Sequence, residues 1–224
     1  MKTDINPITG SANMARRSFL RYAGASAAAV AVMGAAASCK KERVTVAGAT
    51  DIGSGDIGIL NYAYALEQLE AAFYLQVAAT PYSGITAIET AYLTDIRDHE
   101  VLHRDFFKAA LGSKAIMALT TDFSSINFSS RASVLGAAKL LEDTGVQAYD
   151  GAGYLIKDAT YLTLAGKIVS VEARHAALIS NLISPGSFAS DQLDSNGLNK
   201  HASIKDILSA ANGFLKTKVT ANSF

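Results

Sequence analysis

The sequence predicts an all-α protein built on a four-helix bundle. Long stretches carry apolar residues at spacings of three and four, which is the period of a buried helix face. Few stretches show the alternation of β-branched residues that is typical of strands. Glycine and proline stand between the stretches, where they stop helices. We expect helices over residues 59–79, 86–111, 131–156, 160–183 and 203–219.

The connections between these segments predict their arrangement. The first and second helices, and the third and fourth, are joined by short connections, so each pair should form an antiparallel hairpin. About 19 residues, 112–130, separate the second helix from the third, which is long enough to cross the bundle. The last helix should be an accessory one. We therefore assign residues 59–183 to the bundle and 184–224 to a C-terminal extension.

The N-terminal segment, residues 1–38, has the features of an export signal. Arg16 and Arg17 precede an alanine- and valine-rich run of about 15 residues. This pattern resembles a twin-arginine signal. The run is too short and too rich in alanine for a typical membrane span, and a buried helix is the alternative. We expect residues 1–38 to be removed after export.

Cys39 is the only cysteine, and it follows small residues as in the cleavage site of a bacterial lipoprotein. We expect a lipid on Cys39 to anchor the protein to a membrane, at a periplasmic or cell-envelope location. The alternative is a free thiol near the cleaved peptide. Residues 39–58 are rich in glycine, serine and aspartate, and we expect them to form a tether.

The charge balance of the mature chain argues against nucleic acid as a partner. Cleavage before Cys39 removes four basic residues and one acidic residue from totals of 20 and 20, which leaves 16 basic residues against 19 acidic ones. Apart from Lys40 to Arg43 there is no basic cluster. A mildly acidic chain without a basic face gives no support for nucleic-acid binding.

Two of the four histidines follow a glutamate by three residues, in Glu100/His103 and Glu172/His175. Such a pair can be a simple contact on a helix surface. The second pair, however, lies on a helix face that is otherwise apolar, whereas the helix of the first pair is more charged. A carboxylate is costly to bury unless it is paired or binds a metal. The two pairs therefore indicate metal ligands.

Two further glutamates extend the pattern. Each is followed seven residues later by a tyrosine, two turns along the same helix line. These pairs are Glu67 with Tyr74 and Glu142 with Tyr149. The step along the chain from Glu67 to Glu142 is nearly equal to the step from Glu100 to Glu172. The similar offsets indicate an internal duplication of a helix pair.

This arrangement resembles the ferritin-like superfamily of four-helix bundles. The strings LNYAYALEQLEAAFY and VQAYDGA are also similar to bacterial ferritin-like proteins related to plant desiccation-related proteins, and the resemblance covers roughly Ile57 to Ile183. It implies a centre of two iron or manganese ions, held by one glutamate from each of two helices and a Glu-x-x-His from each of the others. Carried over residue by residue, the ligands are Glu67, Glu100, His103, Glu142, Glu172 and His175.

Three other residues are candidates close to the metal ions. Glu70 lies one turn after Glu67 and competes with it as the ligand from the first helix, although the tyrosine spacing favours Glu67. We expect Tyr74 and Tyr149 to hydrogen bond to ligand carboxylates. The alternative for both is a core aromatic ring whose hydroxyl bonds elsewhere.

The expected function is redox chemistry at two metal ions, with oxygen or peroxide as the substrate, as in a ferroxidase or a manganese catalase. Whether the protein is an enzyme stays open. The alternative is a non-enzymatic protein of stress or desiccation protection, or a structural protein, with a static metal or none. Iron storage in a closed shell fits an anchored chain less well. A homo-oligomer is compatible with the sequence.

Overall fold

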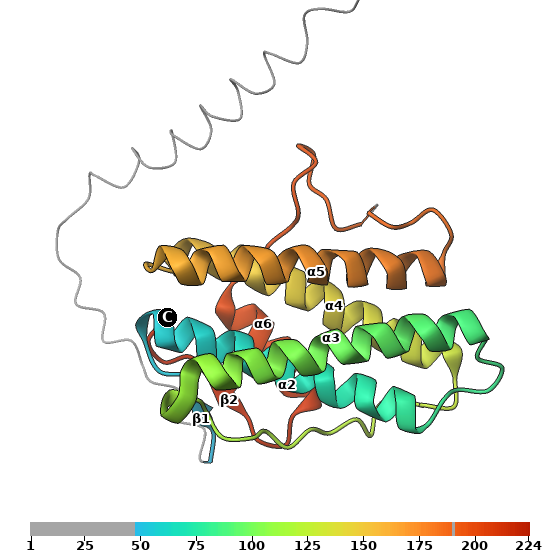
Figure 1. The fold of residues 1–224 in the computed structure, drawn as a ribbon, viewed down its shortest axis with the longest axis horizontal. Helices are drawn as coiled ribbons and strands as arrows, with labels where there is room; N and C mark the ends of the chain where they lie inside the picture. Colours follow the sequence, from blue (N-terminus) through green and yellow to red (C-terminus); the bar gives the residue numbers. More distant parts are fainter. Residues whose placement is uncertain (1–47, 190) are drawn as a thin grey trace, which may run out of the picture. The chain divides into compact units, whose positions relative to one another are not determined.

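The structure, a computed structural model, describes residues 48–189 and 191–224. The long helices are α2 (Gly55–Ala79), α3 (Ala87–Leu111), α4 (Arg131–Ala152) and α5 (Ala159–Ile183), and the shorter α6 (Ile204–Ala211) follows them (Figure 1). Single 3-10 turns extend three of the helices at Gly112–Lys114, Gly153–Leu155 and Asn212–Phe214. The predicted all-α class, with a four-helix bundle and an extra C-terminal helix, is confirmed.

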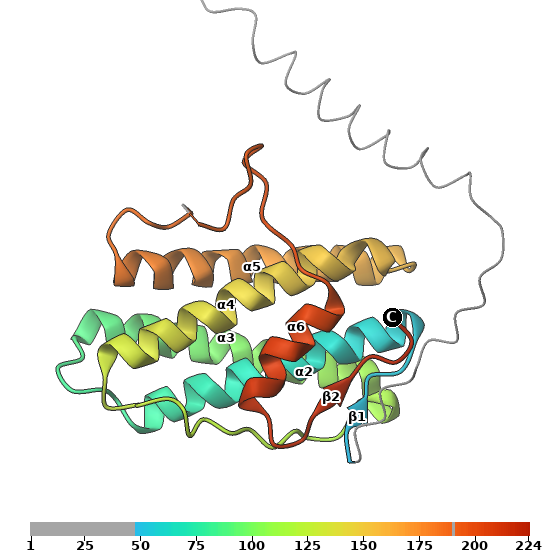
Figure 2. The same cartoon turned by 180° about the vertical axis from the view of Figure 1, so that it is seen from behind.

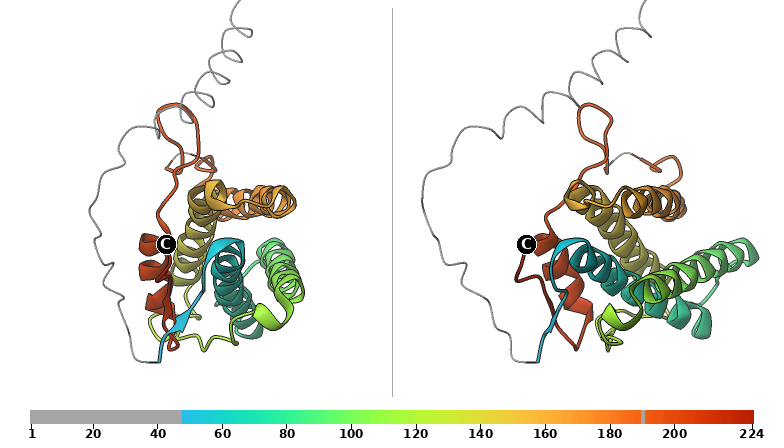
Figure 3. Two further views of the ribbon diagram at one scale, coloured as in Figure 1. Left: turned by 90° about the vertical axis from the view of Figure 1, so that its left-hand side faces the viewer. Right: turned by 60° about the vertical axis from the view of Figure 1, so that its left-hand side comes forward.

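The helices form two hairpins joined by a long connection. Helix α2 packs along α3, α4 packs along α5, and α2 also contacts α4. Seen from behind and end-on, α6 lies against the outer side of α2 and α4, so that this side of the bundle is covered (Figures 2 and 3). No helix in the described part of the chain is long and apolar enough to cross a membrane.

Helix α2 is the central helix and is buried on nearly all sides. Because it is apolar around most of its circumference, it suits an interior position. Its polar Asn61 accepts a hydrogen bond from the backbone N–H of Ile116 and donates to the Lys114 carbonyl, and Gln68 accepts from the N–H of Leu119. These bonds hold the α3–α4 connection against α2.

Side-chain caps define where the helices begin. Thr86 and Glu89 form a capping box at α3, and Ser130, Asp158 and Ser203 each accept a backbone N–H at the start of α4, α5 and α6. Such caps satisfy N–H groups that the first helical turn leaves without partners. The observed starts of α3, α4 and α5 therefore lie within one residue of the predicted ones.

The structure differs from the sequence prediction at both ends of the described region. Helix α2 begins at Gly55, and β1 (Thr50–Asp51) pairs in parallel with β2 (Val219–Thr220), so the segment expected to be a tether is ordered against the bundle from Thr50 onward. Helix α6 ends at Ala211 instead of continuing to residue 219. The side chain of Asn212 bonds the backbone of Val219 and thereby turns the chain into β2.

The C-terminal extension packs closely on α4, where the backbone of Ala202 approaches Gly151. A Cβ atom at Gly151 would lie 2.0 Å from the carbonyl oxygen of Ala202, whereas one at Gly136, in the same helix, would meet open space. We expect Gly151→Ala to lower the free energy of unfolding by at least about 1–3 kcal/mol, because the backbone must move. Gly136→Ala should raise it by about 0.5–1 kcal/mol.

Urea unfolding of the two variants and the wild-type protein would measure both effects. Because the variants place the same residue in the same helix, differences in helix propensity cancel in their comparison. Equal stabilities for the two variants would contradict the close packing of the extension on α4.

Candidate metal centre

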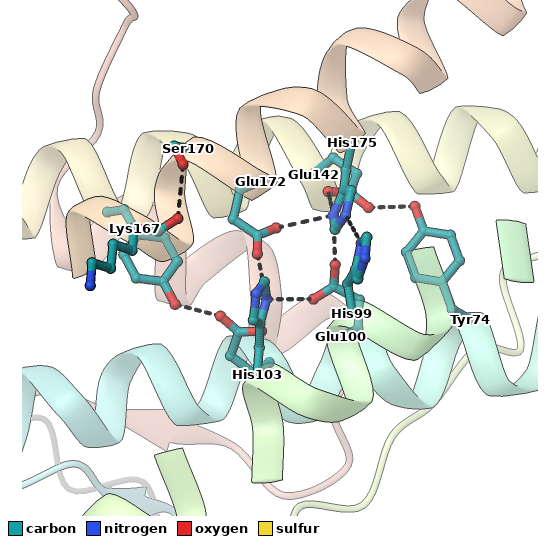
Figure 4. A network of polar contacts seen from close by, with 11 residues as sticks. Tyr74, His99, Glu100, His103, Glu142, Lys167, Ser170, Glu172 and His175 are labelled. Atoms are coloured by element: carbon teal, nitrogen blue, oxygen red, sulfur yellow. Dashed lines mark hydrogen bonds and ion pairs between the residues drawn. The ribbon is translucent and has the colours of Figure 1, made fainter. Parts of the chain in front are cut away.

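The six ligands expected from the sequence come from four helices and converge in the interior of the bundle. The single glutamates lie on α2 and α4. The two Glu-x-x-His pairs lie on α3 and α5 (Figure 4). All four glutamates are fully buried. Because residues i and i+3 lie on the same face of a helix, each pair presents its carboxylate and imidazole to the same space.

The six side chains form two overlapping groups, and in each group one ligand atom per residue lies within 4.8 Å of the others. The first group is Glu67, Glu100, His103 and Glu172, and the second is Glu100, Glu142, Glu172 and His175. Glu100 and Glu172 belong to both groups. Their two oxygens can therefore bridge two ions, whereas each single glutamate and each histidine can serve only one ion.

The two groups have closely matching geometry. Nδ1 of His103 lies 2.8 Å from Glu172 Oε1 and 3.5 Å from Glu67 Oε2. Nδ1 of His175 lies 2.8 Å from Glu100 Oε1 and 3.5 Å from Glu142 Oε2. The duplication inferred from sequence offsets is thus present as an approximate twofold symmetry of the side chains, which carries each group onto the other.

The hydrogen bonding of these atoms tests whether a metal centre fits. Eight of the buried atoms in the described chain that lack a hydrogen-bond partner belong to the six residues: both oxygens of Glu100 and of Glu172, one oxygen each of Glu67 and Glu142, and Nδ1 of both histidines. The nearest contacts of the two Nδ1 atoms are ion-pair contacts of 2.8 Å with carboxylate oxygens, and these are not hydrogen bonds. Buried polar atoms normally have partners, so a set that faces a common space fits metal coordination.

Charge gives the same result. Two divalent cations would balance four ionised carboxylates, and a set of carboxylate oxygens with imidazole nitrogens suits iron(II) or manganese(II). Burial raises the pKa of Glu67 well above its usual range, and it raises the pKa of Glu142 to about 8. Burial also opposes ionisation of Glu100, but the two histidines outweigh it and lower its pKa to about 2.

In the metal-free protein, protonated His103 and His175 supply positive charge beside the carboxylates. Burial disfavours the imidazolium of His103 and of His175, but the surrounding carboxylates outweigh burial and raise the pKa of each to about 12. Metal ligands must be deprotonated, so metal binding has to displace these protons.

The two tyrosines bond across the bundle. The hydroxyl of Tyr74, on α2, donates to Glu142 Oε1 on α4 over 2.5 Å (Figure 4). The hydroxyl of Tyr149, on α4, donates to Glu67 on α2. The sequence predicted bonds to ligand carboxylates but not that each tyrosine bonds to the glutamate of the other hairpin. In Glu142 and in Glu67, one carboxylate oxygen accepts the tyrosine hydrogen bond, and the other oxygen remains available to a metal ion.

We expect Tyr149→Phe to weaken binding of the ion next to Glu67 by about tenfold, because residues that orient ligands typically contribute 10–100-fold in affinity. Tyr62→Phe is the control, since Tyr62 is a buried tyrosine on α2 whose hydroxyl has no hydrogen-bond partner in the described chain. Titration with Co²⁺ would compare the variants. Equal losses for Tyr149→Phe and Tyr62→Phe would show that the hydroxyl of Tyr149 does not orient Glu67.

Glu70, the competing candidate on α2, is buried as well but belongs to neither ligand group. Burial and the nearby carboxylates raise its pKa well above the usual range. One of its oxygens lies 2.9 Å from where a Cβ at Gly145 would be, so the missing side chain there makes room for it. The geometry therefore favours Glu67 over Glu70 as the ligand from α2.

His99 lies next to the centre although the sequence pattern did not single it out. Its Nδ1 is 2.9 Å from Nε2 of His175 (Figure 4). Glu-x-x-His spacing does not mark His99, because it precedes His103 by four residues and contacts a residue of another helix, α5. The twin arginines and Cys39 lie outside the described residues, and His201 lies in an exposed loop.

Comparison with known proteins bears on the whole bundle. A family model described as a ferritin-like domain matches residues 55–185, which is more than half of the chain. The chain belongs to the ferritin-like domain family. The matched region begins with α2 and ends two residues after α5, so it contains every residue of the candidate centre. No curated protein matches the chain.

Proposed function

We propose that this ferritin-like protein binds two iron or manganese ions between α2, α3, α4 and α5 and uses them in redox chemistry with oxygen or peroxide. The observation that carries the proposal is the set of eight buried ligand atoms without hydrogen-bond partners, arranged in two overlapping groups. Bound iron or manganese would supply the electron transfer.

The residues of the chain have distinct parts in this function. Glu100 and Glu172 belong to both ligand groups and would hold both ions. Each histidine completes one position, and the tyrosine hydroxyls fix the single glutamates. The helices exclude bulk water, because all four ligand glutamates are fully buried. The protein thus provides a dry, preorganised site with balanced charge.

Metal analysis followed by turnover assays tests the proposal. After anaerobic loading with Fe²⁺ or Mn²⁺, we expect about two ions per chain, and consumption of oxygen or peroxide that depends on the bound metal. Fewer than about one ion per chain would refute the dinuclear centre. Two ions without turnover would favour the alternative, a protein of stress protection or structure in which the metal only stabilises the bundle.

We further propose that the chain is exported by the twin-arginine pathway and anchored by a lipid on Cys39, on the basis of residues 16–39. In a bacterium that exports the full chain, the wild-type protein should fractionate with membranes, and mass spectrometry should find a lipid on Cys39. Cys39→Ser should release it from the membrane fraction. Replacing Arg16 and Arg17 with lysine should retain the precursor in the cytoplasm. A Cys39→Ser protein that stays with the membranes would contradict the anchor.

A further inference from the structure

His99 is a side chain beside the ligands of the candidate centre that breaks its twofold symmetry. It lies on α3 at the surface of the bundle, one residue before the bridging Glu100. The ring planes of His99 and His175 are 9° from parallel, their centroids are 5.1 Å apart, and Nδ1 of the first is 2.9 Å from Nε2 of the second (Figure 4). These values place the two rings almost edge to edge in one plane, which is the geometry of an in-plane hydrogen bond.

The direction of this hydrogen bond follows from the other nitrogen of His175. Nδ1 faces the carboxylates of Glu100 and Glu142, so it is the nitrogen available to a metal. A neutral imidazole that binds metal through Nδ1 carries its proton on Nε2. Nε2 of His175 therefore donates to Nδ1 of His99, which sets both the tautomer and the rotation of the His175 ring.

The other half of the centre has no counterpart to His99. The same step along the chain that carries Glu100 onto Glu172 carries His99 onto Val171, whose side chain cannot accept a hydrogen bond. Among the described residues, His103 contacts polar side chains only through Nδ1. The six ligands agree in their carboxylate distances and in their tyrosine bonds. The two ligand histidines therefore differ in the partner of Nε2.

We propose that His99 is a positioning residue that makes the two metal positions unequal, so that the ion held by His175 and Glu142 binds more tightly than the ion held by His103 and Glu67. A hydrogen-bond partner on the ring nitrogen that does not bind the metal orients a metal-binding histidine and raises its basicity. Loss of such a partner typically lowers metal affinity 10–100-fold. The proposal rests on the dinuclear centre proposed above. The symmetric ligand set alone would give two equal positions.

Calorimetric titration of the metal-free full-length mature protein with Co²⁺ provides the test. The wild-type protein should show two binding steps separated by about 10–100-fold in affinity. His99→Val copies the residue at the related position, so the tighter step should weaken by that factor and merge with the other. His99→Asn, whose side-chain oxygen can accept the same hydrogen bond, should retain most of the difference. His201→Val, in an exposed loop, is the control and should match the wild type.

A second measurement follows the hydrogen bond itself. In NMR spectra of the Co²⁺-loaded protein, the Nε2 proton of His175 should give a strongly shifted signal that exchanges slowly with water. This signal should disappear in His99→Val and persist in His99→Asn. Two equal steps in the wild type, or equal weakening of both steps in His99→Val, would overturn the proposal. Failure of the wild type to bind Co²⁺ would instead refute the metal centre.

Discussion

Replacing Glu172 with glutamine is expected to abolish binding of both metal ions, whereas replacing Glu142 with glutamine should remove only one. Glu172 belongs to both ligand groups and Glu142 to one. Glutamine keeps the size of the side chain but removes its charge and directs an NH₂ group at the cation. The bound metal should therefore fall from about two ions per chain to fewer than about 0.5 in Glu172→Gln and to about one in Glu142→Gln.

Elemental analysis after loading and gel filtration would measure this, with Asp98→Asn as the control. Asp98 is an exposed carboxylate on α3, two residues from Glu100, so its loss should leave the metal content unchanged. Thermal unfolding of the metal-free variants checks that they are folded. Equal metal content in Glu172→Gln and Glu142→Gln would contradict the bridging position of Glu172.

The inward positions of the candidate ligands were predictable because helical spacing fixes which residues share a face. Glu67, Glu100 and Glu172 lie inward because each shares a helix face with apolar residues three, four or seven positions away. This alignment is a property of the single α-helix and does not depend on the other helices. The bond of Tyr74 to a ligand carboxylate was predicted, but neither its partner Glu142 nor the contact of His99 with His175 was predictable in the same way. Each reaches a residue on another helix, and that depends on the rotation of packed helices, which spacing along one helix does not determine.

The helix boundaries show the same limit. Starts with a capping side chain, such as Thr86 and Asp158, are local features and were predicted within one residue. The pairing of β1 with β2 depends on residues that lie at opposite ends of the described chain. In particular, Asp51 accepts hydrogen bonds from the backbone and side chain of Asn222. Such long-range bonds leave no periodic pattern in the sequence.

The metal-free protein is expected to lose stability as the pH rises from about 5 to 9, because most buried groups of the centre bind protons more tightly when folded. The pKa of Glu142 rises from 4.5 to about 8, so its contribution is complete below pH 4.5 and is lost as the pH passes 8. The pKa values of His103 and His175 rise from 6.5 to about 12, so their contributions decline in the alkaline direction as well. Only Glu100, with a pKa of about 2, acts oppositely, and its contribution is lost below pH 4.5.

Urea unfolding of the metal-free protein at about pH 5, 7 and 9 would measure this slope. Glu142→Gln should flatten it, because the amide does not titrate. The metal-loaded protein should show little or no decline over this range, since bound cations already hold the carboxylates ionised and the histidines neutral. The stabilisation by metal, which is the difference between the two curves, should therefore increase with pH. A metal-free protein that becomes more stable between pH 5 and 9 would contradict the assignment of protons to these buried side chains and leave the burial of four charged carboxylates without a compensating partner.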